Sequence, residues 1–392
     1  MKNVVFVGGI FNDNLNNAYL EHSKNTTNFA ANSYFNKLIN AYKQIDSKVY
    51  VFSSPFMGNY KRDTFDKNND FFVSDSTFFY GKCSTNRFAR LFQLKHALTS
   101  AFKNNKGIIN NDLDTYVFIT QPSLLYLKAA FSISRSFKKV KILLFVPDVT
   151  LFSNLEQKSY FLKLLKIIEH KVITKMLKKV NGFVLFAKQM LEFLPANSHY
   201  TVVEGISSDF NARKSDDEKT ILYTGTLNYA FGIKEFVDVF LEKVPPNIVL
   251  KIAGSGEAAE DFKKIRSDNF KYLGSISPSD CIKEQNKATV LFNPRKPDSL
   301  YTKFSFPSKT MEYLCNNGVV ACFKLEGIPD EYDDYLFYPD EPDLQTLVEK
   351  CIDLCNVDNG YFDKHFTDLK GFLKNKGAKS AVDKIESLLK RV

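Results

Sequence analysis

The sequence lacks the cysteine and histidine patterns that hold a metal ion or a disulfide framework. Its six cysteines include no CxxC pair, and its five histidines do not cluster. Cys351 and Cys355 instead have the spacing of neighbours on one face of a helix. This use of cysteine is typical of proteins in a reducing cytoplasm, so we expect neither a bound metal nor disulfide bonds.

Long hydrophobic runs are also missing. No stretch approaches the roughly 20 apolar residues of a transmembrane helix. The N-terminal sequence MKNVVFVGGIFNDN has too short an apolar run for a secretory signal, and no small-residue cleavage site follows it. We therefore expect a cytoplasmic protein in which residues 4–7 form the first strand of a sheet.

Signatures of nucleic-acid recognition are absent, although the chain is basic. We find no zinc finger, RNP-like or helix-turn-helix pattern. The charge is uneven: residues 1–205 hold 27 Lys and Arg against 14 Asp and Glu, a net +13, whereas residues 206–392 hold 26 against 30, a net −4. An anionic membrane face or an anionic acceptor is the natural partner of the first half, and no nucleic acid is expected.

Length and composition predict two globular domains. A chain of 392 residues is too long for one common domain, and 44% hydrophobic and 25% charged residues are globular values. Short apolar runs alternate with helical patterns in the first half, which indicates a parallel α/β sheet. The expected strands are 4–7, 49–52, 116–120, 141–146, 182–186 and 202–206, and the expected helices are 25–42, 87–103, 155–180 and 188–194.

Residues 155–180 form the longest helical pattern, and it is rich in lysine. Its expected inner face consists of Phe161, Leu165, Ile168, Val172 and Met176. Seven lysines crowd much of the remaining surface. The pattern predicts a helix that packs on the sheet with a solvated lysine face. A helix lying on a membrane is the alternative, and both hold if the lysine side meets lipid headgroups.

The second half repeats a strand, a glycine-containing loop and a helix. Gly225 stands in the first such loop, and Gly254 and Gly256 stand in the second. Each loop alone only weakly indicates a phosphate-binding site. Neither loop has the GxGxxG motif of a dehydrogenase, with an acidic residue at the required distance. Two loops in tandem, followed by the segment 289–322, predict a parallel nucleotide-binding sheet.

Segment 289–322, TVLFNPRKPDSLYTKFSFPSKTMEYLCNNGVVAC, predicts a strand, a cationic loop, a helix and a second strand. Pro307 suits the first turn of the helix, and Asn317 and Gly318 end it. The N-terminus of a helix offers free N–H groups and a positive dipole to an anion. The loop adds positive side chains from Arg295, Lys296, Lys303 and Lys309.

This segment resembles the donor-binding signature of retaining glycosyltransferase family 4, whose members have the two-domain GT-B fold. The family motif reads EGFP…LLEAMACGTPVV, with two glutamates separated by seven residues. Phe306 and Pro307 match its Phe-Pro, Glu312 matches the second glutamate, and Phe304 replaces the first. The segment looks most like a branch of bacterial polysaccharide enzymes that reads NPR…TKYSFPSKTMEY.

The resemblance implies an α/β protein of GT-B fold, with two Rossmann-like domains facing a central cleft. Residues 1–205 would bind the acceptor, residues 206–374 would bind a nucleotide-diphosphate sugar, and a helix at 375–392 would pack back on the first domain. It implies transfer of the sugar with retention and without a metal ion or other cofactor. The acceptor would be a lipid-linked saccharide of capsule, O-antigen or exopolysaccharide synthesis. The protein would then be peripheral at the inner face of the cytoplasmic membrane.

The resemblance also assigns candidate site residues. Gly8 and Gly9, directly after the first strand, would line the cleft. Asp148, just past the strand 141–146, would face the acceptor as a catalytic residue, with capping of the next segment as the alternative. The donor would be held by Gly225, Thr226, Gly254, Arg295, Lys303, Ser305, Phe306, Ser308, Lys309 and Glu312.

Two departures from the family concern the donor diphosphate. Many members hold it with an arginine and a lysine in the first glycine-containing loop, near the positions of Thr226 and Gly232 here. Arg295, Lys303 and Lys309 are the cations that remain. A sugar-nucleotide epimerase of the same fold, a non-catalytic partner in polysaccharide assembly and a nucleic-acid-binding module are the alternatives.

Overall fold

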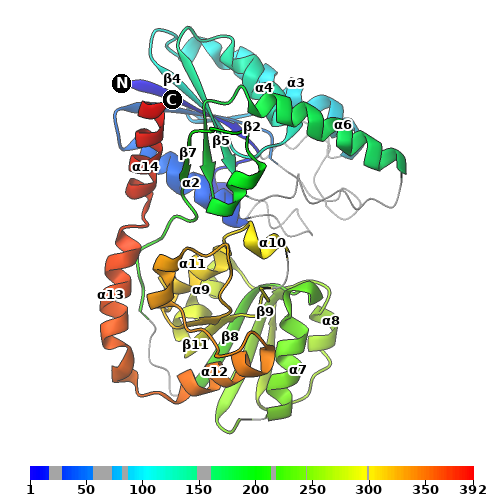
Figure 1. The fold of residues 1–392 in the computed structure, drawn as a ribbon, viewed down its shortest axis with the longest axis vertical. Helices are drawn as coiled ribbons and strands as arrows, with labels where there is room; N and C mark the ends of the chain where they lie inside the picture. The colour runs from blue at the N-terminus through cyan, green and yellow to red at the C-terminus, as the bar shows by residue number, and fades with distance from the viewer. Residues whose placement is uncertain are drawn as a thin grey trace. The chain divides into compact units, whose positions relative to one another are not determined.

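The computed structural model describes residues 1–16, 29–55, 73–81, 87–147, 160–212, 218–243, 245–297 and 300–392. Its contacts divide the chain into two compact units (Figure 1). Unit 1 consists of Met1–Glu204 and Ala378–Val392, and unit 2 consists of Gly205–Gly377. Each unit contains one parallel sheet with helices on both faces, which confirms the predicted fold class.

The sheet of unit 1 has the order β3-β2-β1-β4-β5-β6-β7, and all its strand pairs are parallel. Its centre is built from fully buried apolar runs, because a parallel strand covered on both faces has no solvated side. The order reverses between β1 and β4, which is where open α/β sheets bind ligands. The strands are β1 (Lys2–Gly8), β2 (Ser47–Ser53), β3 (Phe78–Tyr80), β4 (Thr115–Ile119), β5 (Val140–Val146), β6 (Gly182–Leu185) and β7 (Tyr200–Val202).

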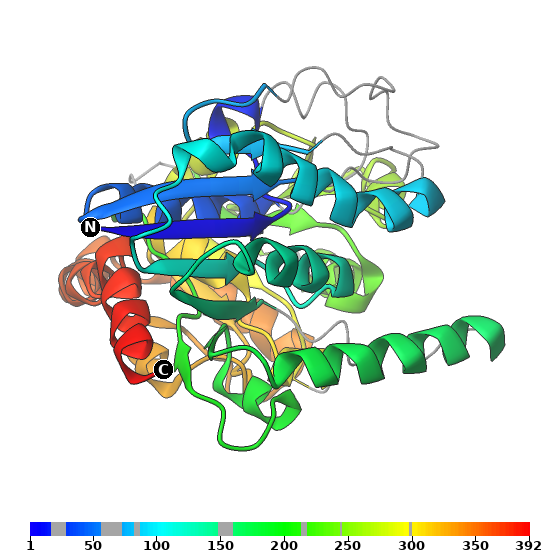
Figure 2. The same ribbon diagram turned by 90° about the horizontal axis from the view of Figure 1, so that it is seen from above.

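Two layers of helices cover this sheet (Figures 1 and 2). Helices α2 (Phe29–Lys43) and α14 (Ala378–Arg391) pack together on one face. Helices α3 (Arg87–Asn105), α4 (Leu124–Ser134) and α6 (Tyr160–Leu177) lie side by side on the other face. The inner face of α2 consists of Tyr34, Phe35, Leu38 and Tyr42, which are all buried.

The predicted inner face of α6 is wrong at Ile168. Val172 and Met176 are only half-buried, and the side chains of Phe161 and Leu165 lie outside those described. Ile168 is 51% exposed, whereas Ile173 and Leu177 are buried. Apolar residues occupy two neighbouring stripes of this helix, so its sequence alone does not decide which stripe faces inward. Packing against α4 selects the stripe displaced by one residue, about 100° around the helix.

Other differences lie in the short elements of unit 1. Strand β3 and helix α4 were not predicted. Residues Lys188–Phe193 form a 3₁₀ helix, η3, in place of an α-helix. The last strand was expected at 202–206 but ends at Val202, because its partner β6 is short and the final pair is Leu185 with Val202.

Helix α14 belongs to unit 1 although it follows all of unit 2 in the chain. It buries Val382, Ile385, Leu388 and Leu389. Glu386 adds polar contacts: it forms an ion pair with Lys2 of β1 and accepts a hydrogen bond of 3.0 Å from the Tyr42 hydroxyl. Unit 1 is therefore completed by residues at both ends of the sequence.

The sheet of unit 2 has the order β10-β9-β8-β11-β12 and reverses between β8 and β11. Helices α7 (Ile233–Lys243) and α12 (Leu344–Asn356) cover one face, and α9 (Pro278–Lys287) and α11 (Ser308–Asn316) cover the other. Cys351 and Cys355 are free thiols on the buried face of α12. The strands are β8 (Lys219–Thr226), β9 (Ile248–Ser255), β10 (Phe270–Gly274), β11 (Val290–Asn293) and β12 (Val320–Cys322).

Candidate functional site

The carboxyl ends of β8, β9 and β11 meet at the reversal point of unit 2. Gly225 and Thr226 of β8 pair with Gly254 and Ser255 of β9. Strand β11 lies on the other side of β8, and Arg295 comes shortly after its last residue. Four of the predicted donor-binding residues, Gly225, Thr226, Gly254 and Arg295, therefore share one edge of the sheet, where ligands of such sheets bind.

The loop between β8 and α7 explains one departure from the family. Gly232 has a φ of +77°, and a Cβ at this position would lie 3.0 Å from the Pro294 carbonyl oxygen. Its N–H donates to the Tyr229 carbonyl, and its own carbonyl accepts from the Phe236 N–H. A side chain is strained in this conformation. The backbone therefore disfavours a lysine at this position.

Arg295 supplies a positive charge at this edge. Its guanidinium carbon lies 4.3 Å from the centroid of the Phe231 ring, a cation–π contact that orients the planar group. Phe231 ends η4 (Tyr229–Phe231), directly before Gly232. The adjacent Lys296 forms an ion pair of 2.7 Å with Glu235 of α7. The two neighbouring cations thus have different surroundings, and Arg295 is the one held against the loop that follows β8.

Glu312 lies in the second turn of α11 and is held by two donors. Lys309 Nζ contacts its Oε1 and Oε2 at 2.8 and 3.0 Å, and Gln285 Nε2 donates to Oε1 at 2.7 Å. About a third of the Glu312 and Lys309 side chains is exposed. The carboxylate is therefore fixed in orientation yet accessible to a ligand, as a residue that accepts hydrogen bonds from a bound molecule must be.

A buried network of hydrogen bonds holds Gln285, the residue that donates to Glu312. The Gln285 amide, fully buried on α9, donates to Thr224 Oγ1 at 2.7 Å and accepts from Asn316 at 2.7 Å. The Tyr313 hydroxyl donates to the Thr224 carbonyl at 2.9 Å and accepts from the Thr224 N–H at 2.8 Å. Burial raises the pKa of Tyr313 well above its usual value, so this hydroxyl remains a donor. The network ties α9 and α11 to the end of β8.

The remaining predicted donor-binding residues, in the loop before α11 and at its start, differ in whether their side chains are buried or accessible. Phe304 and Phe306 are buried, and the Phe306 ring packs 5.3 Å from the Tyr332 ring. Lys303 Nζ lies 5.0 Å from the Phe304 ring centroid. Ser308 is exposed at the start of α11, and Ser305 is half-buried. The Phe306 side chain thus belongs to the core of unit 2 and supports the loop, whereas Ser308 and Lys309 are accessible.

In unit 1, Gly8 stands at the reversal point between β1 and β4. A Cβ at Gly8 would lie 1.9 Å from Thr120 Oγ1, so the close approach of the two strands requires glycine here. Gly9 follows and is half-buried. The predicted catalytic residue Asp148 lies outside the described residues.

Sequence analysis missed Asp13, which follows the Gly8-Gly9 loop. Its Oδ1 accepts hydrogen bonds of 3.0 and 3.1 Å from the side-chain amides of Asn32 and Asn36, two buried residues one turn apart on α2. Partial desolvation raises the pKa of the Asp13 carboxyl, while the amide donors and Lys37 oppose this. The spacing of Asn32 and Asn36 on one face of a predicted helix was the available signal. Gln285 gave no such signal.

Within the described ranges, no three His, Cys, Asp or Glu residues form a group that is placed to hold a metal ion. No helix within these ranges is long and apolar enough to cross a bilayer.

Comparison with known proteins shows a likeness of structure without a detectable likeness of sequence. No family model and no curated protein matches the chain. A crystal structure of TarM superposes with a TM-score of 0.63 at 11% identity, over 99% of this chain and 98% of that one. Anabaena Alr3699/HepE in complex with UDP gives 0.61 at 12% identity over the full length of both chains. The chain has the GT-B fold.

Larger proteins of this fold match in part. The pneumococcal O-GlcNAc transferase GtfA, in complex with UDP and GlcNAc, gives a TM-score of 0.51 at 13% identity. The match covers 76% of this chain and 60% of GtfA. A mutant of S. aureus TarM, in complex with fondaparinux, alpha-GlcNAc-glycerol and UDP, gives 0.51 at 13% identity, over 74% of this chain and 58% of that one. At these identities the comparisons establish the fold alone.

Proposed function

We propose that this GT-B protein is a retaining glycosyltransferase of family 4 that uses a nucleotide-diphosphate sugar. The observation that carries the proposal is the Glu312 carboxylate, fixed by Lys309 and Gln285 beside the reversal point of unit 2. Its position matches the second glutamate of the family motif, so we assign it to the ribose hydroxyls of the nucleotide. The UDP complexes of HepE and GtfA make UDP the first nucleotide to test.

The diphosphate is the leaving group of the proposed reaction. When the bond between the sugar and the diphosphate breaks, negative charge grows on the departing oxygen, and fixed positive groups stabilise it. Arg295, Lys303, Lys309 and the N-terminus of α11 supply such groups without a metal ion. In this proposal Arg295 takes the place of the cations that the family carries near Thr226 and Gly232, and the sugar lies against Ser305 and Ser308.

Unit 1 would bind the acceptor, for which we propose a lipid-linked saccharide of a bacterial surface polysaccharide. Asp13 follows the carboxyl end of β1, and the two buried amides restrain one of its carboxylate oxygens. We assign it to an acceptor hydroxyl, because an oriented carboxylate binds a hydroxyl proton well. Asp148 remains the second candidate for this role.

The function is tested by incubating the protein with single UDP-sugars and with lipid-linked or lipid-free saccharide acceptors. Expected results are a glycosylated acceptor whose new bond keeps the anomeric configuration of the donor in NMR spectra, and no reaction of the donor alone. A donor that epimerises without acceptor would make the protein an epimerase. Donor binding without turnover on any acceptor would favour a non-catalytic assembly partner, and an inverted product would refute retention.

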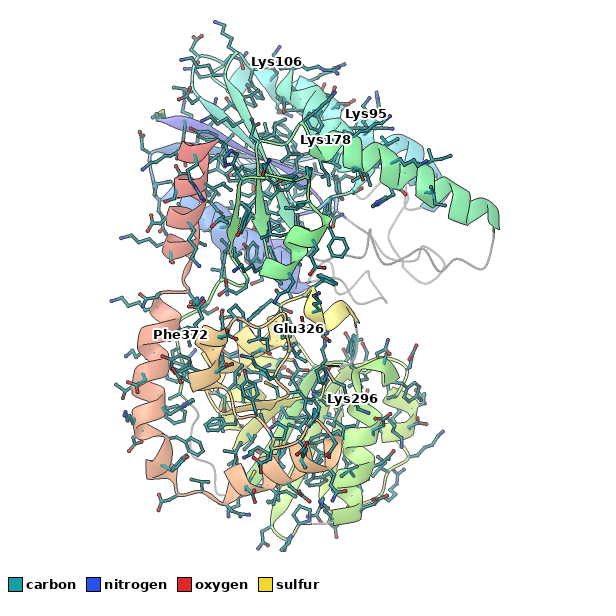
Figure 3. All side chains as sticks on the ribbon, viewed as in Figure 1. Lys95, Lys106, Lys178, Lys296, Glu326 and Phe372 are labelled. Carbon is teal, nitrogen blue, oxygen red and sulfur yellow. The ribbon has the colours of Figure 1, made fainter. Side chains whose placement is uncertain are left out.

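The layer of α3, α4 and α6 is the part of unit 1 that we propose lies on the membrane. Helices α3 and α4 contain no Asp or Glu, and the described part of α6 contains only Glu169. Figure 3 labels Lys95 on α3, Lys106 directly after α3 and Lys178 directly after α6. Ile168 on α6 is half exposed. Exposed lysines and an apolar side chain together suit an anionic bilayer.

Replacement of four exposed lysines of this layer by glutamine is expected to weaken binding to anionic vesicles steeply. Each basic residue near such a surface contributes about 1 kcal/mol, and salt screens the attraction. Co-sedimentation at low and high salt measures the effect, and UDP affinity should not change. The variant replaces Lys95, Lys171, Lys175 and Lys178, and its control replaces Lys263, Lys264, Lys283 and Lys287 of unit 2. Equal pelleting of both variants, or equal binding to neutral vesicles, would contradict the proposal.

A further inference from the structure

A second concave surface lies in unit 2, away from the edge that carries Glu312. It is a groove of about 670 Å³. One wall is the end of η5 (Asp330–Tyr335) together with Phe337, and the other wall is helix α13 (Asp363–Lys374). Phe337, in its wall, pairs with Ala321 of the edge strand β12. Strands β11 and β12 separate this wall from β8. The groove is therefore distinct from the proposed nucleotide site.

Aromatic rings form much of the groove wall. The rings of Tyr335 and Phe372 stack on each other with centroids 4.4 Å apart and an angle of 25°. Phe337 lies 5.1 Å from the His365 ring, and Tyr361 at the rim is 65% exposed. Phe372 is labelled on α13 in Figure 3. Tyr335 and Phe372 already cover one face of each other, and Lys376 Nζ lies 5.3 Å from the Phe372 ring centroid. The exposed Tyr361 ring is therefore the one that can lie against the C–H face of a sugar, while the sugar hydroxyls remain free for polar contacts.

The polar groups of the groove supply those contacts. His365 Nε2 lies 2.8 Å from the Gly318 carbonyl oxygen, so this nitrogen is the donor and Nδ1 is left as an acceptor. Burial lowers the pKa of His365, which keeps the imidazole neutral near pH 7. Asp334 and Asp368 add carboxylates, and among the described residues neither forms an ion pair. Lys364 adds a donor.

We propose that this groove is an accessory site for a neutral saccharide, one that binds a sugar unit of the glycan on which the enzyme acts. Acceptors from His365, Asp334 and Asp368 and a donor from Lys364 match the hydroxyls of a sugar, and the exposed Tyr361 ring matches its apolar face. A quaternary ammonium ion is the competing ligand for aromatic rings beside carboxylates. Such an ion requires several ring faces directed at one point, whereas Tyr335 and Phe372 cover one face of each other.

The identity of the bound glycan as the acceptor chain rests on the proposed function, whereas saccharide binding itself does not. An accessory site would let the protein keep hold of a glycan longer than the unit being modified. Longer acceptors are then expected to bind more tightly than short ones, because a second contact on the same chain adds an intramolecular binding step.

The test uses saturation-transfer NMR on the full chain with maltotetraose, cellotetraose, chitotetraose and mannotetraose as probes. We expect at least one of these to bind, and Tyr361→Ala and Asp368→Asn each to weaken its binding about tenfold, the effect of losing one contact with the ligand. Both positions are exposed, so the fold should persist. Asp353→Asn, at an exposed carboxylate of α12, is the matched control and should bind like the wild type.

Three results would overturn the proposal: no binding of any probe, unchanged binding in both groove variants, or displacement of the probe by tetramethylammonium at equal concentration. UDP affinity, measured in the same samples, separates this proposal from the proposed function. Wild-type protein that binds UDP but no saccharide refutes the groove alone. Protein that binds a saccharide through Tyr361 and Asp368 but never binds UDP refutes the nucleotide site alone.

Discussion

Removal of Ala378–Val392 is expected to unfold unit 1 and leave unit 2 folded. The truncation takes away the buried side chains of Val382, Ile385, Leu388 and Leu389, and it leaves Lys2 and Tyr42 without Glu386. Burial of one such aliphatic side chain contributes roughly 1.5–3 kcal/mol. Loss of four amounts to roughly 6–12 kcal/mol, as large as the whole stability of a typical domain.

Hydrogen exchange measures this effect unit by unit. Amides of β1, β4 and β5 should lose their protection in the truncated chain, whereas those of β8 and β9 should keep it. Ile385→Asp is expected to give the same pattern, because it places a charge in the core. The control is a double substitution on the exposed face of the same helix, Asp383→Ala with Ser387→Ala. Protected β1 amides in the truncated chain would show that unit 1 folds without α14.

Arg295→Ala is expected to lower the affinity for UDP by roughly 10- to 150-fold and to leave the affinity for uridine unchanged. This range corresponds to the loss of one charged hydrogen-bonding group, about 1.5–3 kcal/mol. The reason is that the guanidinium beyond the end of β11 is assigned to the diphosphate, which uridine lacks. Titration calorimetry with both ligands measures the difference. Lys296→Ala, which removes the neighbouring cation paired with Glu235, is the matched control.

Glu312→Ala should show the opposite pattern, since its carboxylate is assigned to the ribose that both ligands share. The affinity for uridine and the affinity for UDP are therefore expected to fall by a similar factor, while the free energy of unfolding changes little. An equal loss of both ligands in the Arg295 variant would remove Arg295 from the diphosphate site, and Lys303 or Lys309 would be tested in its place. Unchanged affinity in the Glu312 variant would refute the nucleotide site itself.

The elements that could be predicted from the sequence are those whose pattern of apolar and polar residues fits only one type of secondary structure and one buried face. Strands such as β5 and β11 are short apolar runs between polar segments, and their existence and type are confirmed. Helix α6 was predicted with the wrong inner face, because two of its stripes are apolar and only packing distinguishes them. Strand β3 has three residues and offers too little pattern to detect.

The candidate site was predictable to a similar degree. The motif around Glu312 marks the edge of the sheet where Arg295 and the paired glycines also lie. It does not reveal Gln285, because a single glutamine in a polar helix looks solvent-exposed until α9 packs against β8 and α11. It also does not reveal that Phe306 is buried or that the backbone at Gly232 disfavours a lysine. Tertiary contacts decide all three.

The ion pair between Lys2 and Glu386 joins residues 384 positions apart, with the whole of unit 2 between them. During synthesis β1 therefore leaves the ribosome long before α14 exists, and α2, β6 and β7, which pack against α14, have to wait for that helix. Unit 2 is continuous in sequence and can fold as soon as it is complete. The first unit to be made is thus the last to be finished, and in the meantime it is the segment most exposed to chaperones and proteases.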